Sequence, residues 1–183
     1  MEEKVKALRS KILVLLGAVG LIGLDQFFKW LAVRYLSGVT THPLIEGVFH
    51  LTYVENRGAA FGILDGKGIF LIVLTAAVLI ALVVLLFMGK FRHPLLLTAI
   101  TLFLGGGIGN LIDRVFRHYV VDFLDFRLIN FAVFNFADCC VVVGTILLFV
   151  YVLFFMDKNK KTDDAVLKHE SEDMQTHDGQ AQS

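Results

Sequence analysis

The chain has 183 residues, of which 56% are hydrophobic, and its mean hydropathy is +0.71. This composition is far more apolar than that of a soluble globular domain, and it indicates an integral membrane protein. The formal net charge is zero, which argues against a nucleic acid as a partner.

Four apolar runs predict a mainly α-helical fold with four transmembrane helices. They cover residues 12–33, 69–88, 95–112 and 139–156. Each run is close to the ~20 residues that a helix needs to cross a bilayer. The first run has a basic start, as a signal peptide does, but it is too long and contains Asp25 and Lys29, so we expect it to be retained. Gly105, Gly106, Gly107 and Gly109 in the third run favour close packing between helices.

The distribution of Lys and Arg predicts the orientation in the membrane. Ten of them lie in the N-terminal segment, the short turn 89–94 and the tail, against six in the longer loops 34–68 and 113–138. The positive-inside bias therefore predicts that both termini are cytoplasmic and that the longer loops lie on the outer side. We expect residues 1–161 to form the membrane domain and the polar, acidic residues 162–183 to form a disordered tail.

The first run carries a charged pair in the stretch LDQFFKW. Asp25 and Lys29 are four residues apart, so they share one face of a helix. Charges inside a spanning helix are costly and are usually functional or paired. We interpret them as a self-neutralising structural pair near the outer interface, with Trp30 as an aromatic anchor, rather than as catalytic residues.

The two longer loops contain segments typical of β-strands. HLTYV at 50–54 and FRLINFAVF at 126–134 are rich in residues that favour strands, and they predict a small β-sheet on the outer membrane surface. The stretch NRGAAFG at 56–62 is either a simple turn or, through Asn56 and Gly58, a source of N–H donors for a bound peptide.

The third run ends in GNLIDR, where three polar residues share a helix face. Asn110, Asp113 and Arg114 are spaced i, i+3, i+4. Asp113 is either the partner of Arg114 in an interfacial ion pair or part of a functional site. Arg114 is the better candidate for binding a substrate carbonyl, because its guanidinium is a fixed cation with several donors.

The fourth run begins in the stretch FNFADCC. Asn135 is placed to cap the helix, and Asp138 would then be the third residue of the first turn, where the helix dipole favours a carboxylate. Capping does not explain Asp122, which lies between apolar residues in VVDF. Cys139 and Cys140 are adjacent and match no zinc spacing, so we interpret them as small apolar helix residues.

Asp122 and Asp138 suggest a specific chemistry if they meet at a dry membrane interface. Two carboxylates close together cannot both ionise easily, so one keeps a proton. The ionised one can activate a water while the protonated one polarises a peptide carbonyl, a reaction that needs neither a metal nor a histidine.

Other functions remain open from spacing alone. Asp25, Lys29, Asp113 and Asp122 could form a proton or ion pathway, although the chain has no inverted repeats of the kind that transporters show. A structural membrane subunit has little need for these polar clusters. An intramembrane protease of the presenilin type would need a GxGD motif, where this chain has GIGN.

Five motifs in order resemble the lipoprotein signal peptidase family, also called signal peptidase II. They are DQFFK, ENRGAAFG, GGGIGNLIDR, VVDF and FNFAD, and the similarity runs from about residue 10 to residue 156. The resemblance implies an aspartic endopeptidase of the bacterial cytoplasmic (inner) membrane that needs no cofactor. Such enzymes cut prolipoproteins just before a cysteine that carries a diacylglyceryl group.

The resemblance also implies roles for individual residues. The catalytic pair maps onto Asp122 and Asp138, while Asp25 and Lys29 map onto positions linked to the integrity of the site. The supporting and substrate-binding positions are Asn56, Gly58, Asn110, Arg114 and Asn135, with Asp113 as a second-tier residue. As partners it implies lipid-modified prolipoproteins, membrane lipids and inhibitors of the globomycin type. One chain can hold the whole site, so we expect a monomer with its site near the extracytoplasmic interface.

Overall fold

The structure is a computed structural model, and it describes residues 2–39, 41–58, 64, 66–129 and 131–156. Within these residues four long helices and a three-stranded sheet account for most of the chain. The elements are α1 (Glu2–Leu36), β1 (His42–Ile45), β2 (Phe49–Asn56), α2 (Gly68–Phe87), α3 (Pro94–Phe116), β3 (Val120–Phe126), the short 3-10 helix η2 (Arg127–Ile129) and α4 (Phe136–Phe154).

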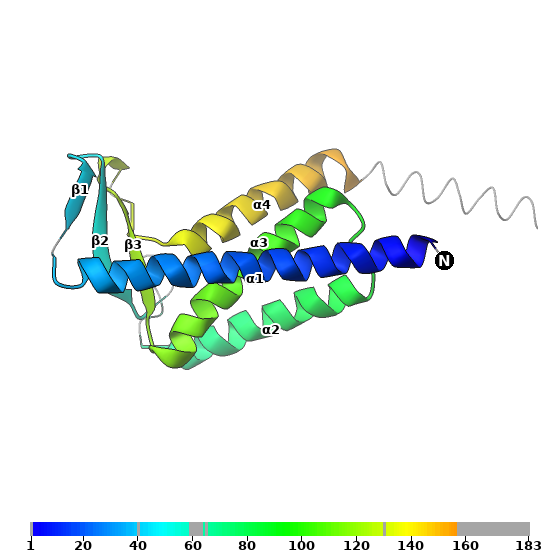
Figure 1. Cartoon of the computed structure of the whole chain (residues 1–183), viewed down its shortest axis with the longest axis horizontal. Coiled ribbons are helices and arrows are strands. Elements are labelled where there is room, and N and C mark those ends of the chain that lie inside the picture. Colours follow the sequence, from blue (N-terminus) through cyan, green and yellow to red (C-terminus); the bar gives the residue numbers. More distant parts are fainter. Residues whose placement is uncertain (1, 40, 59–63, 65, 130, 157–183) are drawn as a thin grey trace, which may run out of the picture.

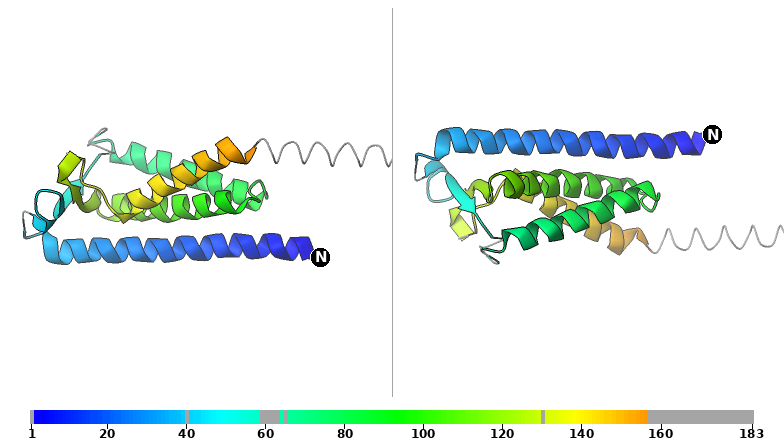
Figure 2. Two further views of the ribbon diagram at one scale, coloured as in Figure 1. Left: turned by 90° about the horizontal axis from the view of Figure 1, so that it is seen from above. Right: turned by 90° about the horizontal axis from the view of Figure 1, so that it is seen from below.

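The helices form a bundle, and the sheet lies beyond one end of it (Figure 1). The N-terminus, the turn between α2 and α3 and the end of α4 lie at the opposite end. Figure 2 shows α1 running along one side of the other three helices. All four helices are long and apolar enough to cross a membrane. The predicted fold class is therefore confirmed.

Each helix buries only a narrow stripe of side chains against its neighbours. One core cluster joins Val14 of α1, Leu86 of α2 and Leu104 of α3. Large apolar side chains cover much of the outside of the bundle, such as Ile69 of α2 and Leu153 of α4, which are 81% and 72% exposed. An apolar exterior of this kind suits a bundle surrounded by lipid.

Helix α3 packs closely against its neighbours through glycines, as its sequence predicts. A Cβ added to Gly105 would lie 2.6 Å from the Leu21 side chain of α1. A Cβ added to Gly106 would collide with the Ala137 carbonyl of α4. Because the partner of Gly106 is backbone, it cannot move aside as a flexible side chain can. These close approaches bring the polar residues of α1, α3 and α4 within reach of one another.

We expect Gly106→Ala to destabilise the protein by roughly 1–3 kcal/mol, the usual cost of overpacking a tight contact. The added methyl would push the start of α4 away from α3. Gly23→Ala on α1 is the matched control, because a Cβ there meets nothing within 4 Å. Thermal unfolding of both variants in detergent measures the difference. Equal melting temperatures would contradict the close contact at Gly106.

The sheet is antiparallel in the order β1-β2-β3. The stretch HLTYV lies in β2, as predicted. The strand predicted at 126–134 is wrong: the third strand is Val120–Phe126, which places Asp122 opposite Val54. After Phe126 the chain turns through η2 and folds back, so that Phe134 bridges to Leu124. Aspartates are poor strand formers, and partners from distant elements compensate for them here.

Several helix ends lie outside the predicted apolar runs, whereas α4 ends at Phe154, before the predicted residue 156. Helix α1 covers Glu2–Leu36 instead of 12–33, and α3 continues past residue 112 to Phe116. Helix α4 begins at Phe136, directly after its cap Asn135. Apolar runs mark the part of a helix that lies in lipid, whereas hydrogen bonding continues into polar flanks. The predicted disordered tail and residues 59–62 of the predicted turn lie outside the described residues.

Candidate active site

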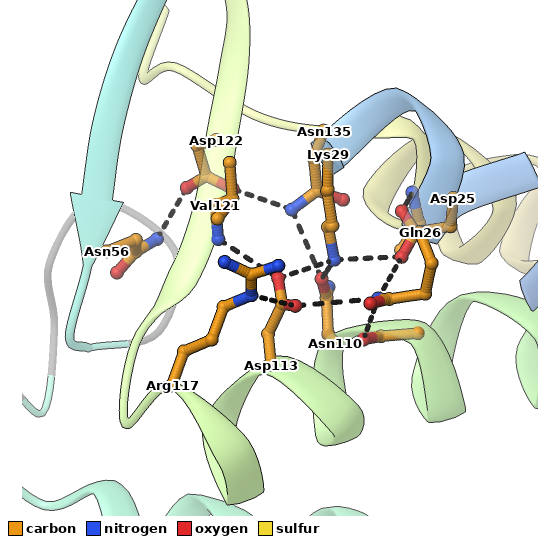
Figure 3. A network of polar contacts seen from close by, with 12 residues as sticks. Asp25, Gln26, Lys29, Asn56, Asn110, Asp113, Arg117, Val121, Asp122 and Asn135 are labelled. Carbon is orange, nitrogen blue, oxygen red and sulfur yellow. Dashed lines mark hydrogen bonds and ion pairs between the residues drawn. The ribbon is translucent and has the colours of Figure 1, made fainter. Parts of the chain in front are cut away.

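A buried cluster of charges joins α1 to α3 (Figure 3). Lys29 and Asp25, which form the predicted pair, lie with Nζ and Oδ2 2.9 Å apart. Lys29 also lies 3.1 Å from Asp113 Oδ2, and these three side chains are 0–1% exposed. Asp113 pairs further with Arg117 at 3.4 Å and accepts the backbone N–H of Val121 in β3 at 3.1 Å. The pair is therefore part of a larger ion cluster that holds α1, α3 and β3 together.

Arg114 is not the partner of Asp113, in contrast to one of the two predicted roles for Asp113. Its guanidinium donates to the Gly58 carbonyl just after β2, at 3.2 Å. Asp113 and Arg114 are adjacent in sequence, so their side chains leave the helix about 100° apart. Arg117 is four residues from Asp113 and shares its face. Arg114 is left facing the loop and the aspartates, where its charge attracts Asp138 and Asp122.

Lys29 also sets the orientation of the Asn110 amide. Its Nζ donates to Asn110 Oδ1 at 2.8 Å, and an ammonium group can only donate. The amide carbonyl must therefore face Lys29, which turns Nδ2 toward Asp138, where it donates to Oδ1 at 2.9 Å. The buried ion cluster is thus connected to Asp138 through one side chain.

Asn135 caps α4 as predicted and touches both candidate catalytic residues. Its side chain accepts the N–H of Asp138 at 3.0 Å, and Asp138 Oδ2 accepts the N–H of Asn135 at 3.1 Å, a reciprocal capping box. Its Nδ2 donates to Asp122 Oδ1 at 2.6 Å and to Asn110 Oδ1 at 3.1 Å. One cap residue therefore positions Asp122 and Asp138 together.

Asp122 is the more buried of the two aspartates, with 2% of its surface exposed. Its second oxygen accepts Asn56 Nδ2 at 2.9 Å, while Asn56 Oδ1 accepts the N–H of Gly58 at 3.0 Å. Burial raises the pKa of Asp122 to about 6. The negative charge of Asp138 also raises this pKa, whereas the hydrogen bonds from Asn56 and Asn135 lower it. Asp138 is only half-buried, so water can reach the pair from its side.

The predicted site residues therefore gather in one region at the sheet end of the bundle. They are Asp25, Lys29, Asn56, Gly58, Asn110, Asp113, Arg114, Asp122, Asn135 and Asp138. Trp30 lies outside this network, 53% exposed and stacked with Phe27. In the described part of the chain, no group of three or more His, Cys, Asp or Glu side chains is placed to hold a metal ion. Cys139 and Cys140 are free thiols.

Two residues of the network were not predicted from the sequence, Gln26 and Arg117. Gln26 donates through Nε2 to Asp25 at 3.2 Å and to the Gly109 carbonyl at 3.2 Å, which ties α1 to α3. Arg117 pairs with Asp113. The spacing of four residues between Asp113 and Arg117 was a usable signal, whereas nothing local to Gln26 indicates a partner on another helix.

Comparisons with known proteins agree on one family. The family model of signal peptidase (SPase) II matches residues 17–154. The lipoprotein signal peptidase of Caldanaerobacter subterraneus subsp. tengcongensis is 50% identical over 132 residues, which cover 72% of this chain and 89% of that protein. The lipoprotein signal peptidase of Clostridioides difficile is 48% identical over 150 residues, which cover 81% of this chain and 100% of that protein.

Solved structures agree with the fold. A bacterial membrane enzyme determined at 2.3 Å by the in meso method superposes with a TM-score of 0.72 and 34% identity, over 76% of this chain and 87% of that one. A second bacterial membrane enzyme, at 1.9 Å, gives a TM-score of 0.70 and 33% identity, over 78% and 94% of the two chains.

Proposed function

The chain belongs to the signal peptidase II family and is a membrane enzyme of that family, and on this premise we propose that it is an aspartic endopeptidase whose catalytic pair is Asp122 and Asp138. Its substrates are prolipoproteins that already carry a diacylglyceryl group on a cysteine. It cuts the peptide bond just before that cysteine and releases the signal peptide.

The observation that carries this proposal is the amide network that the two aspartates share. Asn135 donates from its side chain to Asp122 and from its backbone to Asp138. The remaining two carboxylate oxygens accept side-chain N–H groups, from Asn56 on Asp122 and from Asn110 on Asp138. All four carboxylate oxygens thus accept N–H groups, which holds both side chains in place without a metal ion. Preorganised side chains of this kind lower the cost of reaching a transition state.

The surroundings of the two aspartates suggest different roles. Asp138 lies in the first turn of α4, where the helix dipole stabilises a negative charge, and it is the more accessible to water. Asp138 therefore acts as the base that removes a proton from the attacking water. Burial raises the pKa of Asp122 to about 6, so this side chain more readily keeps the proton and donates it toward the oxygen of the scissile carbonyl.

The atoms balance in this scheme. The water oxygen bonds to the carbonyl carbon while its proton passes to Asp138, and the proton of Asp122 moves to the carbonyl oxygen. The resulting tetrahedral intermediate collapses when Asp138 passes its proton to the nitrogen of the lipid-modified cysteine, the leaving group, and Asp122 takes a proton back from a hydroxyl, which leaves a carboxyl group on the signal peptide. Asn56 and Arg114 border the pair, where Asn56 donates to Asp122 and Arg114 donates to the Gly58 carbonyl.

The direct test is cleavage of a diacylglyceryl-modified prolipoprotein by the purified full-length chain in detergent. We expect the signal peptide to be released at the same rate with and without an excess of a metal chelator, because the aspartate oxygens are held by amide N–H groups. An unmodified precursor serves as the control substrate and should remain uncut. Loss of cleavage with the chelator, restored by a divalent metal, would overturn the aspartic mechanism.

The pH dependence of cleavage tests the role of Asp122. If its proton is needed, kcat/KM falls as the pH rises through about 6, the pKa to which burial raises this carboxyl. The hydrogen bond from Asn56 lowers that pKa, so Asn56→Ala should move the falling limb to higher pH. A kcat/KM profile of wild type and variant measures the shift. A limb that moves to lower pH in the variant would contradict this assignment.

We further propose the setting in which the enzyme works. The sheet end of the bundle faces the extracytoplasmic side of the bacterial inner membrane, and both termini are cytoplasmic. The lipid tails of the substrate stay in the bilayer while its scissile bond reaches the aspartates, and globomycin-type cyclic peptides compete with the substrate for the aspartates. The region up to residue 161 acts as one monomeric domain. The positive-inside distribution of Lys and Arg supports this orientation.

A further inference from the structure

A cavity of about 350 Å³ lies at the end of the bundle opposite the aspartates. Its walls come from the first turns of α1, from the turn between α2 and α3, and from the start of α3. Figure 1 shows that these segments lie at the same end of the molecule. None of the residues proposed for catalysis lines this cavity.

Three cations and one carboxylate surround the cavity. Lys6 and Lys11 come from α1, Arg92 comes from the turn, and Glu3 is the acid. The lining therefore carries a net positive charge. The Ser10 hydroxyl, which also lines it, already donates to the Lys6 carbonyl at 3.1 Å. The charged side-chain donors that a ligand can use in this lining are those of the three cations.

Lys11 is held in place by two contacts with Phe87. It is half-buried, and its Nζ donates to the Phe87 carbonyl at the end of α2 at 2.9 Å. The same ammonium lies 5.5 Å from the centre of the Phe87 ring, a cation–π contact. One donor is thus used to fix the side chain, and an ammonium has two more. A fixed cation loses less entropy on binding an anion than a free one does.

The rest of the lining is apolar. Ala7, Met88, Phe91 and Leu97 contribute side chains, so that the cavity presents charged groups beside a hydrocarbon surface. A ligand that matches both parts has an anionic head and apolar chains.

The position of the cavity along the bundle agrees with such a ligand. Lys11 and Lys29 lie on the same helix, and a rise of 1.5 Å per residue separates them by about 27 Å. This distance is close to the roughly 30 Å of a hydrocarbon core. If the aspartates lie at one membrane interface, the cavity lies at the other, among the headgroups. Basic pockets between helices at that level bind anionic headgroups.

We propose that this cavity is a binding site for the phosphodiester headgroup of an anionic phospholipid. Lys6, Lys11 and Arg92 neutralise the phosphate, and the chains of the lipid run along the apolar wall beside Met88 and Leu97. A lipid held there bridges α1 to the turn between α2 and α3. This inference does not depend on catalysis by Asp122 and Asp138, because it requires only that the bundle spans the membrane.

The test compares two double variants with the same change of charge. Lys6→Gln/Arg92→Gln removes two cations from the lining, while Lys4→Gln/Lys90→Gln removes two neighbouring cations that do not line it. The full chain is placed in nanodiscs of phosphatidylglycerol and phosphatidylcholine in equal parts, extracted into neutral detergent, and its bound lipids are counted by native mass spectrometry. We expect wild type and the control variant to retain phosphatidylglycerol and the lining variant to lose it by about tenfold or more. Equal retention by both variants would overturn the proposal.

Two further measurements keep the result decisive. Excess inorganic phosphate should leave the retained phosphatidylglycerol in place, and displacement by phosphate would mean an anion site without lipid selectivity, contrary to the proposal. Wild-type protein is also crosslinked with a photoactivatable phosphatidylglycerol, a measurement that needs no substitution. We expect labelled peptides from residues 2–11 and 88–97, and labelling spread evenly over the helices would contradict the site.

Discussion

Asp122→Asn and Asp138→Asn should each lower the cleavage of lipid-modified prolipoprotein at least about 1,000-fold, because each removes a group that must accept or donate a proton in the reaction. An amide has the size of a carboxylic acid but cannot exchange a proton in this way. Since both residues act in one step, we expect the double variant to be no slower than either single variant. Rates measured with the full-length chain in detergent, at the pH optimum of the wild type, check this result.

The structure offers a matched control on the same strand. Asp125 lies in β3 with Asp122, but its carboxylate accepts Thr52 Oγ1 at 2.6 Å and Arg127 Nε at 2.9 Å. Burial acts to raise the pKa of Asp125, but these two hydrogen bonds and the charge of Arg127 outweigh burial, so the pKa is lowered. Asp125→Asn keeps an oxygen that can accept from Thr52, so cleavage should stay within a few-fold of wild type.

The outcome of this comparison separates catalysis from folding. Thermal unfolding of the three single variants should show that all of them remain folded, so that the lost rate belongs to chemistry. If either Asp122→Asn or Asp138→Asn kept a tenth or more of the wild-type rate, that residue would not be one of the catalytic pair. If Asp125→Asn were as slow as the other two variants, the loss of rate would come from a disturbed β-sheet and not from the loss of a catalytic group.

Lys29→Met should have the largest effect on stability, a loss of about 3–5 kcal/mol, because it leaves two carboxylates buried without their common cation. Lys29 is 0% exposed and lies within 3.1 Å of both Asp25 and Asp113. The variant also removes one of the two donors that orient the Asn110 amide toward Asp138 and leaves only Asn135. We therefore expect the remaining folded protein to cleave more slowly as well.

A double variant tests whether unpaired charge is the reason. Asp25→Asn/Lys29→Met removes one acid together with the cation, and Asp113 keeps Arg117 as a partner at 3.4 Å. We expect this variant to be more stable than Lys29→Met alone. Lys90→Met, at an exposed lysine, should change stability by no more than about 0.5 kcal/mol. A double variant that is less stable than Lys29→Met would show that the loss does not come from buried charge.

Local spacing decided much of what the sequence predicts correctly. Long apolar runs leave few alternatives to membrane-spanning helices, so the four spans could be found without any knowledge of packing. Asp25 and Lys29 are one helical turn apart, and Asn135 and Asp138 have the spacing of a capping box, so these contacts follow from helix geometry alone. The five motifs were also enough to indicate the family.

Contacts between distant segments could be found only in the tertiary structure. The sequence left Asp113 with Arg114 as one of two options, whereas the fold gives it Lys29 from the distant helix α1. The third strand was placed too late in the chain, because the side chains that satisfy Asp122, from Asn56 and Asn135, lie far away in sequence. Such partners depend on how closely α1 and α4 approach α3, and the glycines of α3 set that distance. A charge in an apolar environment binds whichever polar group packing brings within reach, and sequence separation does not limit that choice.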